Sequence, residues 1–228
     1  MSSDSGSTSK KPMPNFAAGL VQRGKYGYTS YRKLKRIVDI VVSGIALVLL
    51  SPIMLVIALC IIAADGTPVI FRQKRIGEDG KTFTMLKFRS MVKNAEEVLK
   101  RDPELYAKFQ QSFKLENDPR ILPIGNFIRK TSLDELPQLW NVLRGDMSIV
   151  GPRPIVEKEL AMYGDKQDLY KAMKPGCAGL WQCSGRSDTT YEERVELDEQ
   201  YFVSASIRND IKILVMTFLA IVRRDGAK

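Results

Sequence analysis

Two adjacent carboxylates, Asp134 and Glu135, form a good candidate site for chemistry on a charged substrate. They follow two cations, Arg129 and Lys130, within the segment RKTSLDELP. An ionised carboxylate can bind a divalent cation or attack phosphorus as a nucleophile. The chain contains no histidine, so the usual general base and the commonest zinc ligand are excluded. Any catalytic or metal-binding role therefore falls to other side chains, and the acidic pair is the first to consider.

The same segment also matches a purely structural pattern. Ser132 and Glu135 have the S-x-x-E spacing of a capping box, in which the two side chains bond amides at the start of a helix. Pro137 fits such a first turn, where its missing amide donor matters little. Acids at a helix N-terminus lie in a favourable potential and stay ionised. The structural and functional interpretations are compatible, and the pattern alone favours neither.

Three cationic segments could bind the phosphates of a substrate. In GDMSIVGPRP, two prolines hold Arg153 on a stiff backbone, and arginine presents a planar fork to phosphate. In KFR, strand alternation places Lys87 and Arg89 on one face. The third segment, KPGCAGLWQCSGR, contains Gln182 and Arg186. A rigid surface turn and a solvated strand edge are the alternatives for the first two, and the last two segments are weak signals alone.

A long apolar segment must place these residues relative to a membrane. Residues 37–64 read IVDIVVSGIALVLLSPIMLVIALCIIAA, 28 residues with one charge, Asp39. About 20 apolar residues suffice for a helix to cross a bilayer. Ser51 and Pro52 lie at the midpoint, where proline removes an amide donor and predicts a kink. The hydroxyl of Ser51 can satisfy a carbonyl that the kink frees.

The charges that flank this segment favour a re-entrant hairpin over a simple span. Positively charged residues next to membrane segments prefer the cytoplasm. Cations occur on both sides of the apolar run: Arg32, Lys33, Lys35 and Arg36 before it, and Arg72, Lys74, Arg75 and Lys81 after it. A helix-break-helix that enters and leaves on the same face satisfies both ends, and we prefer it to a single transmembrane anchor.

The remaining segments predict a leader and a compact domain of short elements. Residues 1–30 are rich in Ser, Gly, Lys and Pro, and we expect a mostly disordered leader there. Beyond residue 66 the patterns predict a β-hairpin over 69–91 with a turn at 78–80, a charged helix over 92–115 interrupted at Pro103, and helices at 136–143, 155–173, 191–204 and 207–222. The domains are therefore 1–30, 31–66 and 67–228.

Composition restricts the partners and the compartment. The formal net charge is +9, which suggests an anionic partner such as a phospholipid surface, a nucleic acid or a phosphorylated substrate. Three cysteines without a framework spacing indicate a reducing, cytoplasmic environment. No aromatic-interleaved basic face of the single-strand-binding type is present, so nucleic acid is not expected as a partner.

Taken in order, these segments resemble the monotopic phosphoglycosyl transferases, also called the bacterial sugar transferase family. The resemblance covers about residues 31–224, and SLDELPQLWNVLRGDMS followed by GPRP is its most specific part. It implies a re-entrant membrane helix broken at Ser51-Pro52. We therefore expect an α+β fold, with that helix-break-helix, a small and mostly helical cytoplasmic domain containing a β-hairpin, and interfacial amphipathic helices.

The resemblance also implies a reaction. Asp134 would attack the β-phosphorus of a UDP-sugar, UMP would leave, and undecaprenyl phosphate would then take the sugar-1-phosphate from the aspartyl intermediate. Glu135 would complete the dyad by orienting metal or activating the acceptor, with Asp134 and Glu135 as the ligands of Mg²⁺. Residues expected to bind substrate are Lys87, Arg129, Arg153, Arg186 and Gln182. Glucose or galactose is favoured weakly as the sugar.

The implied setting is the bacterial inner membrane, with the catalytic domain facing the cytoplasm and membrane lipid as a partner. The reaction would be the first membrane step of surface glycan assembly, as for exopolysaccharide, lipopolysaccharide or capsule, and a homodimer is left open. Two other classes remain. A membrane-anchored binding module predicts that Asp134→Asn leaves function intact, and a metal-dependent hydrolase predicts sugar phosphate released without a lipid acceptor.

Overall fold

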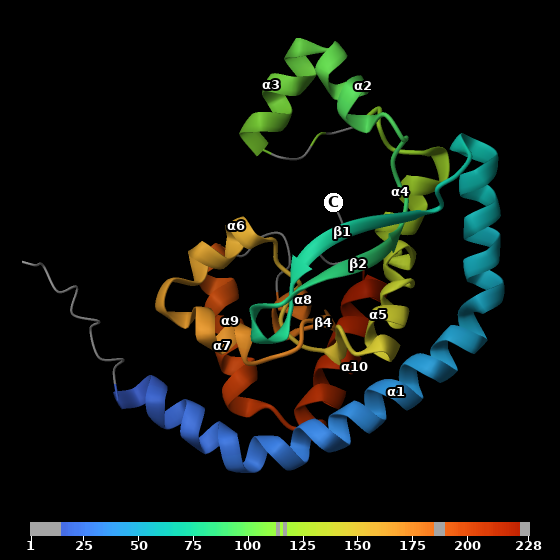
Figure 1. Ribbon diagram of the computed structural model, residues 1–228. Helices are drawn as coiled ribbons and strands as arrows, with labels where there is room; N and C mark the ends of the chain where they lie inside the picture. Colours follow the sequence, from blue (N-terminus) through green and yellow to red (C-terminus); the bar gives the residue numbers. More distant parts are fainter. Residues whose placement is uncertain (1–14, 113–114, 116–117, 185–189, 224–228) are drawn as a thin grey trace, which may run out of the picture.

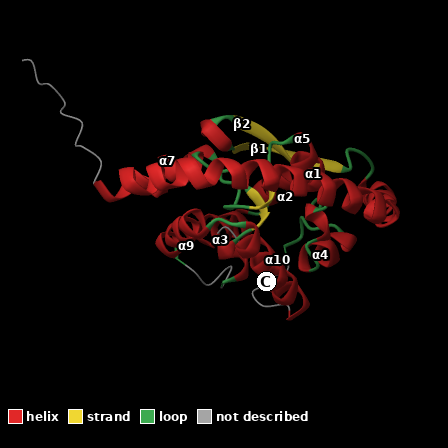
Figure 2. Cartoon of the chain, turned by 90° about the horizontal axis from the view of Figure 1, so that it is seen from below, coloured by secondary structure: helices red, strands yellow, loops and turns green. Residues whose placement is uncertain are grey.

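A computed structural model describes residues 15–112, 115, 118–184 and 190–223, and its first element is a long helix. Helix α1 spans Asn15–Asp65 and curves as an arc around one side of the molecule (Figure 1). Seen from below, it runs across the width of the molecule (Figure 2). The expectation of a disordered leader is therefore wrong for residues 15–30, which are helical, while residues 1–14 lie outside the described part.

The helix continues through Pro52 without a break. Proline cannot donate to the carbonyl one turn before it, which belongs to Val48. The Ser51 hydroxyl donates to that carbonyl at 2.8 Å, as the sequence led us to expect. Because the freed acceptor is satisfied, the chain bends and stays helical (Figure 1). The predicted helix-break-helix is thus corrected to one curved helix.

Most of the apolar surface of α1 is not covered by protein. In the stretch Ser30–Asp65, the apolar window has a mean hydropathy of 3.1 and only 11% of it is buried. Val48 and Leu49 have exposed fractions of 73% and 70%. By length and composition this helix could cross a membrane, and its exposure sets it apart from the core helix of a soluble protein.

The domain that follows begins with the predicted hairpin. Strand β1 (Ile70–Ile76) pairs antiparallel with β2 (Thr82–Phe88), and the short 3-10 turn η1 (Glu78–Gly80) joins them. Helices α2 (Ala95–Arg101) and α3 (Pro103–Ser112) then project beyond the hairpin, separated near Pro103 as expected (Figure 1). The later helices include α4 (Pro123–Lys130), α5 (Gln138–Arg144), α8 (Leu180–Cys183), α9 (Tyr191–Ser204) and α10 (Ile207–Arg223).

A second pair of strands was not predicted from the sequence. Strand β3 (Ser148–Val150) lies parallel to β4 (Gly176–Ala178). The two backbones approach so closely that a Cβ on Gly176 would lie 2.1 Å from the amide nitrogen of Gly151. Glycine is therefore required at this crossing, and what the sequence presented as two loops forms one ladder in the core.

The helix expected over 155–173 is divided into three short pieces. These are α6 (Glu157–Leu160), the 3-10 segment η3 (Ala161–Lys166) and α7 (Gln167–Lys171). Gly164 has a φ of 54°, which an α-helix does not accommodate. The break lets Tyr163 and Tyr170 enter one buried cluster with their ring centroids 5.1 Å apart.

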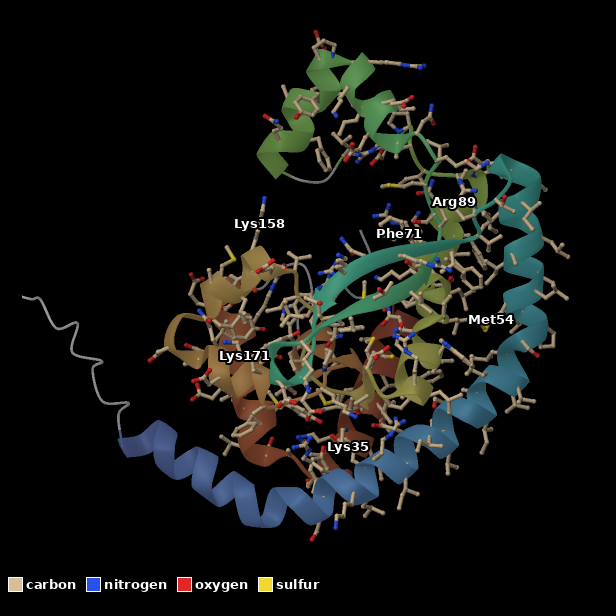
Figure 3. All side chains as sticks on the ribbon, viewed as in Figure 1. Lys35, Met54, Phe71, Arg89, Lys158 and Lys171 are labelled. Carbon is tan, nitrogen blue, oxygen red and sulfur yellow. The ribbon has the colours of Figure 1, made fainter. Side chains whose placement is uncertain are left out.

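The amino-terminal half of α1 is fastened to the domain by buried polar groups. Asp39 accepts hydrogen bonds from the Ser148 hydroxyl (3.0 Å) and from the Ile149 amide (2.9 Å). Lys35 donates to Asp210 of α10 at 2.7 Å, and Figure 3 shows it on the inner side of the arc. The single charge in the apolar run is therefore an anchor to β3.

Arginines fasten α1 at two further points. Arg36 donates to the carbonyls of Val142 and Leu143 at the end of α5, at 2.6 and 2.8 Å. At the other end of α1, the buried Arg89 pairs with Asp65 and donates to the carbonyl of Gly66 (Figure 3). Arg89 is therefore not part of a solvated strand edge, because its guanidinium closes the carboxyl end of α1.

Candidate active site

The acidic pair lies on a short 3-10 turn, η2 (Leu133–Glu135), between α4 and α5. The expected capping box is absent: Ser132 has a φ of 57° and makes no capping hydrogen bond with its side chain. The left-handed conformation is costly for a residue other than glycine, and such strain is often found at functional sites. The purely structural interpretation of S-x-x-E is therefore wrong, and Glu135 is available for other contacts.

Glu135 is paired with Lys87 across the site. The Lys87 ammonium donates to a carboxylate oxygen of Glu135 at 2.6 Å, with side-chain exposures of 23% and 37%. The hairpin positions Lys87 near the end of β2, and η2 presents Glu135 to it. A partly exposed pair of this kind contributes little to stability. It holds the Glu135 carboxylate in one orientation beside Asp134.

Asp134 carries a strongly shifted pKa. Burial, together with the negative charge of Glu135, raises the pKa of Asp134 to about 6, and the positive charges of Lys87 and Arg129 offset only part of this. We expected acids at a helix N-terminus to be stabilised as anions. The turn is too short to supply that potential, so burial decides the direction. Burial and the neighbouring negative charge thus disfavour the ionised form of Asp134, and a carboxylate that is poorly stabilised as an anion is a more reactive nucleophile.

Two of the predicted phosphate ligands, Arg129 and Arg153, lie within the described part of the chain. Arg129 lies in the last turn of α4, where its charge acts on Asp134. Arg153 follows β3 and is exposed, with its guanidinium 5.1 Å from the centre of the Trp181 ring. Such stacking leaves the edge of a guanidinium open to an anion.

The other two predicted ligands are Gln182 and Arg186. Gln182 lies in α8 and donates to the Cys177 carbonyl of β4 at 3.3 Å. Arg186 falls within 185–189, outside the described part of the chain. Their roles in binding remain predictions.

One cation near the site was not recognised as a candidate from the sequence. The hairpin register pairs Arg75 with Phe83 and Lys87 with Phe71. Residues directly opposite share a face, and alternate residues return to it, so Arg75 and Lys87 lie on the same face of the hairpin. The Gly-containing turn fixes the register of the hairpin, so the sequence could have indicated that Arg75 and Lys87 share a face. Arg75 was overlooked because it lies in a run of basic residues.

An apolar groove opens next to the acidic turn. Its volume is about 310 Å³, and its lining consists of apolar residues from α1 and α4 with Leu133 of η2: Pro52, Ile53, Val56, Ile57, Cys60, Ile124, Phe127 and Leu133. Leu133 immediately precedes Asp134, so the lining of the groove includes a residue of the turn that carries the carboxylates. Phe127 is 56% exposed in this groove, which is unusual for a large aromatic side chain of a soluble protein.

The donor groups of the turn fit Mg²⁺ better than a transition metal. Asp134 and Glu135 supply carboxylate oxygens, and the described residues form no cluster of three or more acidic, cysteine or histidine side chains. Mg²⁺ commonly binds through one or two carboxylates and completes its sphere with water and substrate phosphates. The residues present therefore fit the expected ion, provided that a phosphorylated substrate shares it.

The fold combines one helix that is long and apolar enough to cross a membrane with a carboxylate pair beside cations. The model of the family described as "Bacterial sugar transferase" matches residues 30–224, and the chain belongs to this family. The resemblance drawn from its motifs is thereby confirmed.

The chain is similar to several named members of the family. It is 52% identical over 202 residues to the undecaprenyl-phosphate galactose phosphotransferase of Salmonella typhimurium, covering 87% of this chain and 42% of that protein. It is 43% identical over 194 residues to the UDP-glucose:undecaprenyl-phosphate glucose-1-phosphate transferase of Escherichia coli, covering 82% and 39%. The exopolysaccharide production protein ExoY of Rhizobium meliloti is 42% identical over 197 residues, covering 85% and 87%. The chain thus spans less than half of the first two relatives and most of the third.

Proposed function

We propose that this protein transfers a sugar-1-phosphate from a UDP-sugar to undecaprenyl phosphate and releases UMP. The observation that carries the proposal is the position of Asp134. It lies among Lys87, Arg129 and Glu135, at the end of an apolar groove formed with α1. Transfer of a phosphate to a lipid requires a charged site for the phosphates and an apolar surface for the lipid chain, and here the two lie side by side. The names of the relatives, which refer to undecaprenyl phosphate and to galactose or glucose, support the same reaction.

In the first half-reaction, a carboxylate oxygen of Asp134 attacks the β-phosphorus of the donor. The bond from that phosphorus to the oxygen bridging to UMP breaks, and UMP leaves with the bond electrons. In the second, a phosphate oxygen of the acceptor attacks the phosphosugar–aspartyl intermediate and returns Asp134 as a free carboxylate. Splitting the reaction lets a soluble donor and a lipid acceptor react in turn at one nucleophile.

The cations around the turn hold the charged groups of both substrates. Arg129 lies where its charge favours the anionic form of Asp134 and can offset the developing negative charge. Lys87 orients Glu135, which is placed to accept a proton from the acceptor phosphate if that group arrives protonated. Asp134 and Glu135 would hold Mg²⁺, which when bound neutralises diphosphate charge and favours departure of UMP.

The apolar groove provides for the acceptor. An isoprenoid chain is wholly hydrocarbon, and the groove has an entirely apolar lining that ends at Leu133. A phosphate attached to a chain lying there would reach the turn that carries Asp134. We therefore place the first isoprene units between α1 and α4.

The attachment of α1 supports the re-entrant topology. Arg36 bonds the end of α5 near the start of the apolar run, and Arg89 bonds its far end at Asp65 and Gly66. Both ends are thus fastened to the same globular domain. A straight helix across the bilayer would separate its ends by about 30 Å on opposite faces. The proposed setting is the inner membrane, entered by α1 from the cytoplasmic side, where the flanking cations belong.

The test is UMP release by purified protein in lipid nanodiscs with Mg²⁺, using UDP-galactose, UDP-glucose and N-acetylated UDP-sugars, with and without undecaprenyl phosphate. We expect sustained release only with the lipid, and a loss of roughly a thousandfold or more in Asp134→Asn. Asp79→Asn, at the exposed turn of the hairpin, is the matched control and should retain activity. Without the lipid, the parent should release no more than one UMP per protein and gain the mass of a hexose phosphate on Asp134.

The other outcomes have definite meanings. Continuous release of sugar phosphate without the lipid would identify a hydrolase. No UMP from any donor, by protein that unfolds cooperatively on heating, would favour a binding module. Equal activity in Asp134→Asn and the parent would remove Asp134 from the reaction.

A further inference from the structure

The loop that carries Arg153 is anchored along its whole length. On one side β4 holds it: the Gly151 amide donates to the Ala178 carbonyl at 2.9 Å, and the Gly176 amide donates to the Pro152 carbonyl at 2.8 Å. The residues before Arg153 therefore have no freedom to move independently of the ladder.

The hairpin side of the loop is held by a buried tyrosine. The Tyr170 hydroxyl lies 3.0 Å from the Ile76 carbonyl and 3.2 Å from the Arg153 carbonyl, and accepts a hydrogen bond from the Ile155 amide at 3.2 Å. The Ile76 amide also donates to the Ile155 carbonyl at 2.9 Å. Tyr170 is fully buried, so these bonds join the hairpin to the loop away from water.

Arg75 also bonds this loop, at Pro154, which lies between the two loop residues that Tyr170 contacts. Its guanidinium donates to the Pro154 carbonyl at 3.0 Å and to the Gln73 side chain at 2.6 Å. The side chain is only 11% exposed, and its nearest carboxylate, that of Glu159, is 3.5 Å away. The Nε–H of Arg75 is buried with no partner among the described residues. The Nε–H is thus an unsatisfied donor on a guanidinium that is otherwise bonded, and a buried unsatisfied donor costs stability.

Arg75 and Arg153 also place two positive charges close together. Burial, and then the positive charge of Arg153, lower the pKa of Arg75. Like charges held in this way repel until an anion lies near them, so the arrangement is prepared for a negatively charged ligand. Glu135 acts on Arg75 as well, which places this cationic region within electrostatic reach of the acidic turn.

We propose that Arg75 is a positioning residue for Arg153: by holding the Pro154 carbonyl, it directs the Arg153 guanidinium toward the diphosphate of the donor. The proposal rests on the proposed function for the identity of the ligand, but the position of Arg153 can be tested without any reaction.

The first experiment uses Trp181, which lies against Arg153, as a spectroscopic reporter. The chain has two tryptophans, so Trp140→Phe leaves Trp181 as the only one. In that background Arg75→Gln should change the Trp181 emission and weaken binding of UMP, measured by calorimetry, roughly tenfold or more, since displacement by about 1 Å can cost a hundredfold. Arg72→Gln is the control, because Arg72 is exposed on the other face of β1.

The second experiment measures transfer kinetics. Arg75→Gln should raise the KM for the UDP-sugar roughly tenfold or more and leave the KM for undecaprenyl phosphate unchanged. Arg75→Lys, which keeps a donor and a charge, should recover part of the loss. Because Arg75 acts through Arg153, the double variant with Arg153→Gln should be no worse than Arg153→Gln alone.

Several results would overturn the proposal. Losses that add fully in the double variant, an unchanged Trp181 spectrum, or equal changes in both KM values would each do so. If Arg75→Gln does not fold, Tyr170→Phe in α7 removes the hydroxyl that contacts the same loop. It should give the same donor-specific effect, and the absence of that effect would overturn the proposal. A parent without transfer activity but with Arg75-dependent UMP binding would refute the proposed function and leave the positioning role standing.

Discussion

Asp134 gives a test in which activity and stability are expected to change in opposite directions. Its pKa is raised from 3.8 to about 6, so the folded protein disfavours the charged form that the reaction needs. Above pH 6 the ionised carboxylate therefore lowers the free energy of unfolding, by at most about 3 kcal/mol at 1.36 kcal/mol per pH unit. Because the site is partly open to solvent, we reduce this to about 1–2 kcal/mol.

The neutral variant Asp134→Asn should remove that cost. At pH 8 we expect its melting temperature to exceed that of the parent by about 2–8 °C, measured by scanning fluorimetry in nanodiscs. The sign follows from the raised pKa: the cost is complete above pH 6, is about half as large at pH 5, and vanishes as the pH falls toward 3.8. Asp79→Asn, an exposed substitution of the same kind, should show no such pH-dependent gain. If Asp134→Asn is less stable than the parent at pH 8, the argument that burial raises the pKa is refuted.

Three further substitutions test the fold that positions the site. Gly176→Ala should lower the free energy of unfolding by about 2 kcal/mol or more, because its Cβ would meet the Gly151 amide nitrogen at 2.1 Å and only backbone could move; a lower melting temperature in thermal unfolding checks this. Asp39→Ala should cost about 1–3 kcal/mol by leaving the Ile149 amide buried without an acceptor, and hydrogen exchange at β3 should rise. Pro52→Ala should restore a backbone hydrogen bond and straighten α1, so UMP release should fall while thermal stability is kept or increased; a fully active variant would contradict this.

Features set by neighbouring residues could be predicted from the sequence. The hairpin follows from alternation and a glycine-containing turn, and the interruption near Pro103 follows from the chemistry of proline. The bond from the Ser51 hydroxyl to the carbonyl freed by Pro52 is likewise a local matter. In each case the decisive groups lie within a few positions of one another along the chain.

Features set by residues far apart in the sequence could not be predicted in this way. The S-x-x-E spacing cannot reveal that the Glu135 carboxylate pairs with Lys87, because the two residues are 48 positions apart in the sequence. The pairing of β3 with β4 is similarly hidden, because each strand has three residues and reads as loop. In the site, the residue types alone predicted Asp134 and Glu135 as candidates. Only the packing of the folded chain reveals that Asp134 is buried enough to raise its pKa. Arg75 was missed because its importance comes from the carbonyl it holds.

In the proposed membrane setting, the arginines that fasten α1 determine how deeply the helix lies in the bilayer. A helix that crosses a membrane adjusts its tilt to the local hydrocarbon thickness, and the resulting mismatch sorts proteins among membranes. The apolar run of α1 is bonded to the globular domain at its start by Arg36 and at its far end by Arg89. Its depth is then fixed by the protein, and we expect activity in bilayers of short-chain and long-chain lipids to vary little with thickness.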